Sequence, residues 1–586
     1  MNNFILNLES QNKLHLNLSK KSTNLNNIQK QHINFLRQNT EFIILMCDKN
    51  LGPAIIERSK YIRLLLKEHL LNKQNYTQLQ PTEAEHLLMK MKDDTCSLFV
   101  EHANKLSKHE IKYFRNFILK LPTSLRIPQY YGMPKVHKQK IPIPLRPVVS
   151  QCGSYTAFIS TWIDNKLQPL KHFLPSYIKN SQDLLDIIDT LPPLPPNAKI
   201  VTTDAVSMYS NISTKEGIHN ITTYLNKFSS ESDRHFPIDL VCSLLEVVMQ
   251  NNIFKFGTTW WQQLDGTAMG TPCACIYATL FFGLHERQLL LTKYKENLLL
   301  YKRQIDDIFI VWVPTSPNNI EWTHFVQDLN CCSSLSWETE TLDNKTHFLD
   351  LNLWIDSSTR KINYSTYQKP MNLFLYIPNH SAHPTNTIKS LIYGLLQTYK
   401  RQNPNPLHFR NLTKLLFNRL RVRGHKPYEL REFFKNALVK LDQKQRQTQY
   451  NNNNNNNNNL QKTTIINTPT TPKTTLPTTL TTTPTTPTKS NPSPDNLLFL
   501  HLHYHPKGLT RRNIQQTYTQ QCTTTNPENK SGLDNMPNEI TGGQLTIKKL
   551  TVAYHRPKNL RDILCPTTLL ESDTTSVSTI ASELNK

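Results

Sequence analysis

Residues 298–313 read LLLYKRQIDDIFIVWV, in which two arms rich in aliphatic and aromatic side chains flank the doublet Asp306-Asp307. Such arms favour β-strands, and because no Gly, Pro or Asn lies between them, the doublet is predicted at the tip of a tight hairpin. Two adjacent carboxylates amid apolar arms repel each other and lose hydration, so they require a positive partner, most simply a divalent metal ion. An isolated Asp-Asp pair is more often a solvated turn than a metal site. The motifs in the rest of the sequence distinguish between these two interpretations.

A third carboxylate lies upstream in KIVTTDAVSMYSNI, residues 199–212, where apolar residues lead into Asp204. This pattern predicts Asp204 at the end of a strand. Mg²⁺ prefers hard oxygen ligands and keeps its remaining positions for phosphate and water, so carboxylates brought together from separate strands suit it. Neighbouring residues of a strand point to opposite faces, and we therefore expect Asp306 to face Asp204 while Asp307 assists from the side.

The composition indicates an acidic partner and a reducing compartment. The 586 residues include 67 Lys and Arg against 44 Asp and Glu, a formal net charge of +23. A polyanion is the simplest reason for this excess, and a basic surface kept for solubility is the alternative. The ten cysteines match neither a zinc site nor a disulfide framework, and neither a signal peptide nor a membrane span is recognisable. We therefore expect an intracellular protein of the cytoplasm or nucleus that is not secreted and does not bind membranes.

Local patterns divide the chain into parts. Residues 42–61 place two apolar runs around a DKN-LG turn, which predicts a β-turn-β unit, and the proline-rich residues 121–150 predict extended loops or edge strands. Asn451–Asn459 and the Thr/Pro stretch up to Pro494 hold too little apolar surface for a core and favour extended chain. Residues 497–516 and 544–564 recover strand-then-helix patterning, which predicts one small element interrupted by a mobile loop.

Three motifs in order, D-x-x-x-x-Y, Q-x-x-G-x-x-M-G-x-P and I-D-D-I-F, resemble the palm motifs of reverse transcriptases. More narrowly, the chain resembles the polymerases of Penelope-like retroelements over roughly 42–442 and 497–565. Several ordered motifs are more specific than any one of them. The strings that carry this resemblance are DKNLG (48–52), MPKVHK (133–138), LRPVVS (145–150), QLDGTAMGTP (263–272), HFLDLNL (347–353) and YQKPMNLFLYIPNHSAHP (367–384).

The resemblance implies an α+β right-hand polymerase whose palm holds an antiparallel sheet. It would extend a DNA primer with dNTPs on an RNA template, using two Mg²⁺ ions or Mn²⁺ in their place, with Asp204, Asp306 and Asp307 as catalytic residues and metal ligands. Its expected parts are a weakly ordered arm (1–40), an N-terminal region with fingers (41–198), a palm (199–385), a helical thumb (386–442), a disordered linker (443–496) and a small basic C-terminal element (497–586).

The resemblance also implies roles for residues around the acids. Lys135, Lys138 and Arg146 would neutralise the triphosphate, Gln263 would hydrogen-bond near the nucleotide sugar, and Lys369 would grip the primer. Gly266 and Gly270 permit close approach of another chain, either template and nucleotide or, in the alternative, a strand against a helix start. Tyr209 occupies the position of an aromatic steric gate against ribonucleotides. The chain departs from the family pattern at Gln304 and at Cys273, Ala274 and Cys275.

Two alternatives remain open from the sequence. An RNA-dependent RNA polymerase shares the carboxylate chemistry and differs in the sugar that it selects. A catalytically inactive RNA-binding protein derived from a retroelement would share the basic surface, although all three candidate acids are present.

Overall fold

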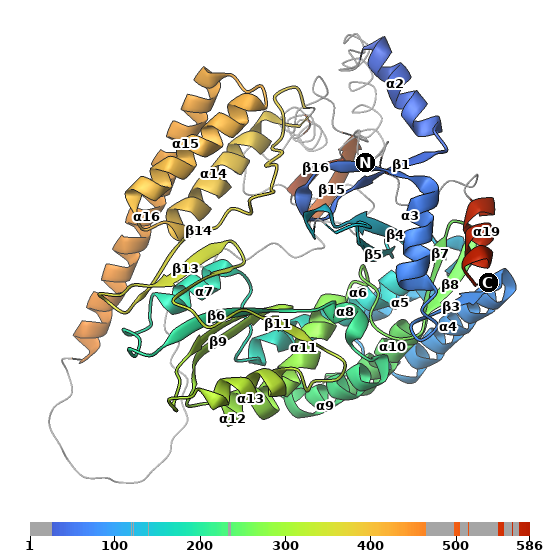
Figure 1. Ribbon diagram of the computed structural model, residues 1–586, viewed down its shortest axis with the longest axis horizontal. Helices are drawn as coiled ribbons and strands as arrows, with labels where there is room; N and C mark the ends of the chain where they lie inside the picture. The colour runs from blue at the N-terminus through green and yellow to red at the C-terminus, as the bar shows by residue number, and fades with distance from the viewer. Residues whose placement is uncertain are drawn as a thin grey trace, which may run out of the picture. The chain divides into compact units, whose positions relative to one another are not determined.

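The computed structural model describes residues 26–463 except 119, 121, 139, 233–235 and 382, and beyond them residues 497–503, 514, 549–555, 565 and 574–585 (Figure 1). The chain divides into two compact units. The larger consists of His32–Leu375, Tyr399–Leu412 and Leu560–Lys586, and the smaller of Met1–Gln31, Tyr376–Thr398 and Thr413–Asn559. Both units combine helices and strands, as the sequence predicts.

A four-stranded antiparallel sheet lies at the centre of the larger unit. Its strands, in spatial order, are β11 (Trp337–Thr339), β6 (Lys199–Ala205), β10 (Asp307–Trp312) and β9 (Leu298–Gln304). Strands β9 and β10 form the hairpin predicted for residues 298–313.

Strand β10 is buried on both faces, and its side chains alternate between two cores. Ile308, Ile310 and Trp312 belong to the larger core, with α9, α11 and α13 on that face of the sheet (Figure 1). Phe309 and Val311 belong to a second core, which includes residues of α7 and of the neighbouring three-stranded sheet. Each buried aliphatic or aromatic side chain stabilises the fold by roughly 1.5–3 kcal/mol, so this strand is firmly fixed.

The three-stranded sheet is antiparallel and follows the four-stranded one in the chain. It consists of β12 (Lys345–Phe348), β13 (Leu351–Ile355) and β14 (Ile362–Thr366). Its residues Phe348, Leu351 and Leu353 contribute to the core on the second face of β10.

The N-terminal half supplies a hairpin and a five-stranded sheet. The hairpin of β1 (Phe42–Met46) and β2 (Pro53–Glu57) confirms the predicted β-turn-β unit. Strand β5 lies at the edge of the five-stranded sheet, as predicted. It contains Pro147, and an edge strand tolerates the N–H donor that proline lacks. The five strands, in spatial order, are β3 (Tyr76–Leu79), β8 (Thr259–Gln263), β7 (Asn252–Phe256), β4 (Gln129–Pro134) and β5 (Leu145–Ser150).

Helices fill most of the remaining chain of the larger unit. They are α3 (Arg58–Leu65), α4 (Pro81–Glu101), α5 (Lys108–Ile118), α6 (Tyr155–Leu167), α7 (Ser181–Ile188), α8 (Met208–Asn211), α9 (Thr214–Ser232), α10 (Ile238–Gln250), α11 (Ala274–His285), α12 (Leu291–Lys293), α13 (Ile320–Leu329) and α19 (Thr574–Asn585). In the described part of the chain, no helix combines the length and the apolar character that crossing a membrane requires.

The expected helical region after residue 386 is present as α14 (Thr385–Gln402), α15 (Pro406–Val422) and α16 (Pro427–Thr463). Helix α16 continues through the Asn tract, which differs from the extended linker predicted from residue 443. No Pro or Gly interrupts the chain between Pro427 and Pro469, so nothing in the backbone stops the helix at 443. Residues 464–496 of the predicted linker lie outside the described residues.

The two ends of the chain are described in part. Helix α2 (Asn27–Gln38) occupies the end of the predicted arm, whose residues 1–25 lie outside the described residues. The predicted strands of the C-terminal element are β15 (Leu497–His503) and β16 (Lys549–His555), which pair in parallel. The loop and the helical segments predicted between and after them lie outside the described residues, apart from Ile514.

Candidate active site

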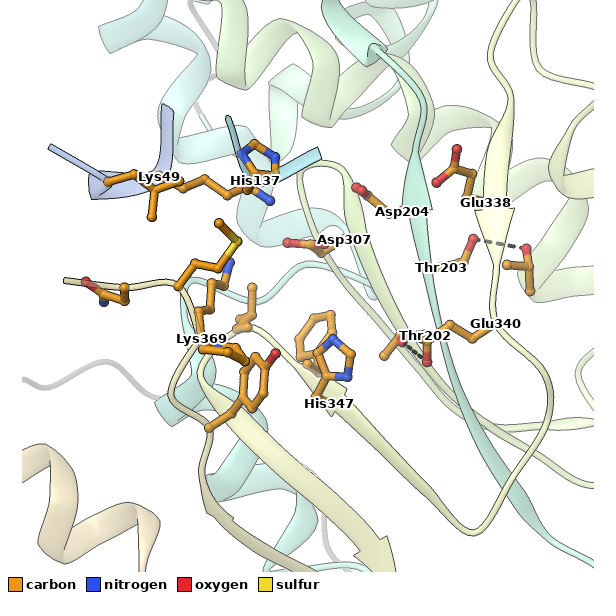
Figure 2. A pocket seen from close by; sticks show the side chains of 18 residues that line it. Lys49, His137, Thr202, Thr203, Asp204, Asp307, Glu338, Glu340, His347 and Lys369 are labelled. Carbon is orange, nitrogen blue, oxygen red and sulfur yellow. Dashed lines mark hydrogen bonds between the residues drawn. The ribbon is translucent and has the colours of Figure 1, made fainter. Parts of the chain in front are cut away.

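Two of the three predicted carboxylates meet across neighbouring strands. Asp204 is the next-to-last residue of β6, Asp307 is the first residue of β10, and the two are direct partners in the antiparallel register. Side chains at opposite positions point to the same face of a sheet, so these carboxylates share one surface. Both line a cleft of about 510 Å³ in the larger unit (Figure 2). The predicted strand end and hairpin tip are therefore confirmed.

The turn between β9 and β10 decides which acid of the doublet faces Asp204. Ile305 and Asp306 form this turn, and Ile305 has a φ of +58°, which is rare for a β-branched residue and costs roughly 1–3 kcal/mol. The alternation of side chains between the two faces of β10 therefore starts at Asp307, which lies opposite Asp204. The expectation that Asp306 faces Asp204 is wrong. Asp306 stays beside the pair, since its carbonyl accepts a hydrogen bond of 3.0 Å from the backbone N–H of Ala205.

The three acids form a concentration of negative charge. Burial, Asp306 and Asp204 raise the pKa of Asp307 to about 6, and burial and Asp306 raise the pKa of Asp204. Within the described ranges, no Lys, Arg or His forms an ion pair with any of the three. No ion pair among the described residues neutralises their charge, so the three acids can accept a divalent metal ion.

A fourth carboxylate, not predicted from the sequence, extends this row. Glu338 of β11 is the register partner of Asp204 on its other side and lines the same cleft. Strand β11 has three residues, too few to give a recognisable alternation in the sequence.

The protein side chains alone do not complete a metal site. Across the residues that the structure describes, no three His, Cys, Asp or Glu side chains are arranged to hold a metal ion. Mg²⁺ usually takes one or two carboxylates and completes its octahedron with water and substrate phosphates. Asp204 and Asp307, with Asp306 in the adjoining turn, fit that partial ligand set.

Basic side chains lie across the cleft from the acids. Lys49, His137 and Lys369 line it, and Lys49 lies close enough to favour the ionised forms of Asp204 and Asp307 (Figure 2). Lys369 does the same for Asp307, so the structure brings this predicted residue to the site. Burial and the charge of Lys49 lower the pKa of His137, so the two lysines are the positive charges of this side. Lys49 was not predicted, because its position depends on the turn Asp48–Asn50, where Lys49 itself has a φ of +60°.

The three other predicted cations lie within range of one another's charge, and one of them pairs with a buried acid. Arg146 forms an ion pair of 3.0 Å with Asp48, whose side chain is buried. Burial and the charge of Arg146 lower the pKa of Lys135, and Lys138 favours the ionised form of Asp204. None of the three lines the cleft itself, and part of the charge of Arg146 is neutralised by Asp48.

Tyr209 lies in the short helix α8, which follows the strand β6 that carries Asp204. Its hydroxyl group lies 3.3 Å from Sγ of Cys275, one of the residues that depart from the family pattern. The ring is half-buried against the larger core, and Asp306 and Arg146 are among the charges that act on it. The backbone is fixed by a 2.6 Å hydrogen bond from the N–H of Thr267 to the carbonyl of Tyr209. This position is compatible with the predicted gate.

Two glycines of the motif QLDGTAMGTP, Gly266 and Gly270, allow close packing of the protein's own backbone. At Gly266 a Cβ atom would lie 2.7 Å from the carbonyl oxygen of Ser210, and at Gly270 it would lie 2.1 Å from the carbonyl oxygen of Val149. Both glycines have positive φ angles, which other residues rarely adopt. The close approach expected for template and nucleotide is thus made by the protein's own backbone. Gly266 keeps the segment after Tyr209 in place, and Gly270 packs against β5.

Gln263 also lies in the interior. Its side chain is buried, and its amide donates a 2.9 Å hydrogen bond to the carbonyl of Asp265. The structure therefore does not bring Gln263 into the cleft, because β8 pairs with both β3 and β7 and points this side chain inward.

Comparison with solved structures finds telomerases and viral RNA polymerases at low identity. Telomerase from Candida albicans, in complex with a fragment of telomeric RNA, is 11% identical with a TM-score of 0.44, over 69% of this chain and 67% of that one. Apo telomerase from Candida tropicalis is 10% identical with a TM-score of 0.39, over 70% of each chain. The BmCPV RNA-dependent RNA polymerase is 10% identical with a TM-score of 0.32, over 67% of this chain and 30% of that one. Neither a protein-family model nor a curated protein matches the sequence.

The crowded carboxylates predict a specific effect on stability. Without divalent cations, Asp307→Asn should raise the free energy of unfolding at pH 7 by about 1 kcal/mol, because it removes one of the repelling, partly buried charges. Addition of Mg²⁺ should stabilise the wild type more than the variant. Thermal unfolding with and without Mg²⁺ measures both effects.

Asp356→Asn is the control. Hydrogen bonds from Ser358 and Thr359 lower the pKa of Asp356 to about 2, so its ionised form is stabilised and its loss should lower stability. A loss of stability in Asp307→Asn as well would show that the cleft carboxylates are not in mutual repulsion.

Proposed function

We propose that this chain is an RNA-directed DNA polymerase, a reverse transcriptase of a retroelement similar to the Penelope-like elements. One observation carries the proposal: Asp204 and Asp307 are register partners at the ends of two central strands, with Asp306 in the adjoining turn and no cation in contact with them among the described residues. Such a row of unneutralised carboxylates beside basic side chains suits the binding of metal-bound triphosphates.

The parts of the fold take the roles that this activity requires. The four-stranded sheet would be the palm, the five-stranded sheet and the β1–β2 hairpin would form the fingers, and helices α14 to α16 would form the thumb. The net charge of +23 supports a nucleic acid partner, because Lys and Arg neutralise backbone phosphates without reading sequence. Binding should therefore weaken steeply with salt.

Asp204, Asp307 and Asp306 would hold two Mg²⁺ ions. When bound, these ions make the primer 3′-hydroxyl more acidic and stabilise the charge that develops on phosphorus. The carboxylates of Asp204 and Asp307, fixed on paired strands, set the place where the reacting groups meet.

The reaction forms a phosphodiester bond and breaks a phosphoanhydride bond. The 3′ oxygen of the primer forms a bond to the α-phosphorus of the dNTP, the bond from that phosphorus to the β-phosphate oxygen breaks, and the hydroxyl proton is released to solvent. Pyrophosphate leaves with the bonding electron pair. Lys49 lines the cleft opposite the acids, where its ammonium group would neutralise the charge of the departing phosphates. Lys369, from the loop after β14, would contact the primer.

Removal of either paired acid tests the proposal. Asp204→Asn and Asp307→Asn should each lower the rate of primer extension by about a thousandfold or more, because each removes a metal ligand. RNA binding should stay nearly unchanged, since the basic surface is intact. The assay is extension of a labelled primer on an RNA template, with filter binding of the same RNA.

Asp356→Asn again serves as the control, because this acid lies in the turn between β13 and β14, does not line the cleft and should not affect extension. More than about a tenth of wild-type activity in either cleft variant would rule out its role as a metal ligand.

Sugar selection separates this proposal from an RNA-dependent RNA polymerase. The hydroxyl of Tyr209 contacts Sγ of Cys275, its backbone carbonyl is bonded by Thr267, and the charge of Asp306 acts on it, so its ring would be a rigid obstacle to a 2′-hydroxyl. Exclusion by shape rejects the ribonucleotide more than it helps the deoxyribonucleotide.

Tyr209→Val should therefore lower the preference for deoxy- over ribonucleotides by roughly tenfold or more, while deoxynucleotide use falls less. Tyr209→Phe is the matched control, because it keeps the ring and should keep the selectivity. Incorporation of both nucleotide types on one RNA template gives the ratio. An unchanged ratio in an active Tyr209→Val variant would exclude the gate, and a wild type that prefers ribonucleotides would favour the RNA polymerase alternative.

A further inference from the structure

A buried ion pair lies directly behind the turn that carries the acids. Nε of Arg303 lies 2.6 Å from Oε1 of Glu286, and Nη2 donates to Oε2 at 2.9 Å. Both side chains are 1% exposed, the lowest exposure of any ion pair among the described residues. Arg303 belongs to β9, and Glu286 follows helix α11.

The remaining donors of Arg303 reach backbone carbonyls. Nη2 also donates to the carbonyl of Thr279 at 2.9 Å, and Nη1 donates to the carbonyl of Ile305 at 2.9 Å. Glu286 is itself held by a 2.6 Å hydrogen bond from the hydroxyl of Ser176. The guanidinium therefore joins α11 to the first residue of the turn.

The Ile305 carbonyl belongs to the peptide group that links Ile305 to Asp306. Because Ile305 has an unfavourable positive φ, this peptide would relax if nothing held it, and the direction of the following acids would change with it. We propose that Arg303, held by Glu286, is a positioning residue that fixes the Asp306-Asp307 turn in the arrangement needed to bind metal. The kinetic part of this inference rests on the proposed function; the structural part does not.

Only an arginine satisfies this geometry. Its planar fork donates to a carboxylate and to two carbonyls at once, whereas a lysine offers one nitrogen. Burial of two charges is costly, and an apolar pair of similar volume would often be as stable. Stability alone therefore does not explain why this pair is charged, while the bond to Ile305 does. The ring of Phe282, 5.2 Å from the guanidinium carbon, further limits its movement.

Arg303→Lys tests the inference, because it keeps a positive charge for Glu286 and removes the bond to Ile305. We expect kcat for primer extension to fall by about 100-fold, the effect of a small misplacement of reacting groups. The KM for primer–template should change by less than about twofold, and the Mg²⁺ concentration for half-maximal activity should rise. Amide hydrogen exchange at residues 304–307 should become about tenfold faster or more, without faster exchange elsewhere in β6 or β9.

Two further variants keep the test decisive. Lys302→Arg, on the other face of β9, is the matched control and should change none of these quantities. If Arg303→Lys does not fold, the double variant Arg303→Met with Glu286→Leu leaves no buried charge unpaired and should give the same kinetic and exchange pattern.

Wild-type kcat and exchange at the turn would overturn the inference, and so would faster exchange spread evenly over the sheet. If the wild type extends no primer but exchange at 304–307 alone responds to Arg303→Lys, the positioning role stands and the proposed function fails.

Discussion

Mutual repulsion among three carboxylates at the end of β6 and β10 is the constraint around which the larger unit is organised. Asp204, Asp306 and Asp307 are held together although the charges of Asp306 and Asp204 raise the pKa of Asp307, and the charge of Asp306 raises that of Asp204. Such an arrangement persists only where the surrounding structure is stable enough to impose it. The burial of β10 on both faces, by two separate cores, supplies that stability.

Other acids of the larger unit, in contrast to those of the cleft, are paired with cations. Arg303 is paired with Glu286, Asp48 with Arg146, and Glu110 with Lys166. Only at the cleft, among these described sites, are carboxylates gathered without a partner in contact, while Lys49 and Lys369 stand across from them. A structure that pairs these three acids with cations, and leaves the carboxylates of one cleft unpaired, is suited to a cation that arrives with its substrate.

The sequence predicted what local pattern controls and missed what depends on distant contacts. The strand end at Asp204 and the 298–313 hairpin follow from β-favouring residues, and both are confirmed. The facing acid was assigned wrongly because nothing in the sequence signals a positive φ at Ile305. Glu338 and Lys49 reach the cleft through pairing and a turn that lie far from the doublet in the chain. Gly266 and Gly270 were recognised as points of close approach, but their partners, Ser210 and Val149, are visible only in the fold.

The most direct test of the account is one primer-extension measurement with the wild-type chain on an RNA template, with Mg²⁺ present and the deoxy- and ribonucleoside triphosphates supplied separately. We predict extension to the end of the template with deoxynucleotides, negligible extension with ribonucleotides, and none after the divalent cation is chelated. Extension with ribonucleotides alone, or no extension with either set while the RNA is bound, would contradict the account.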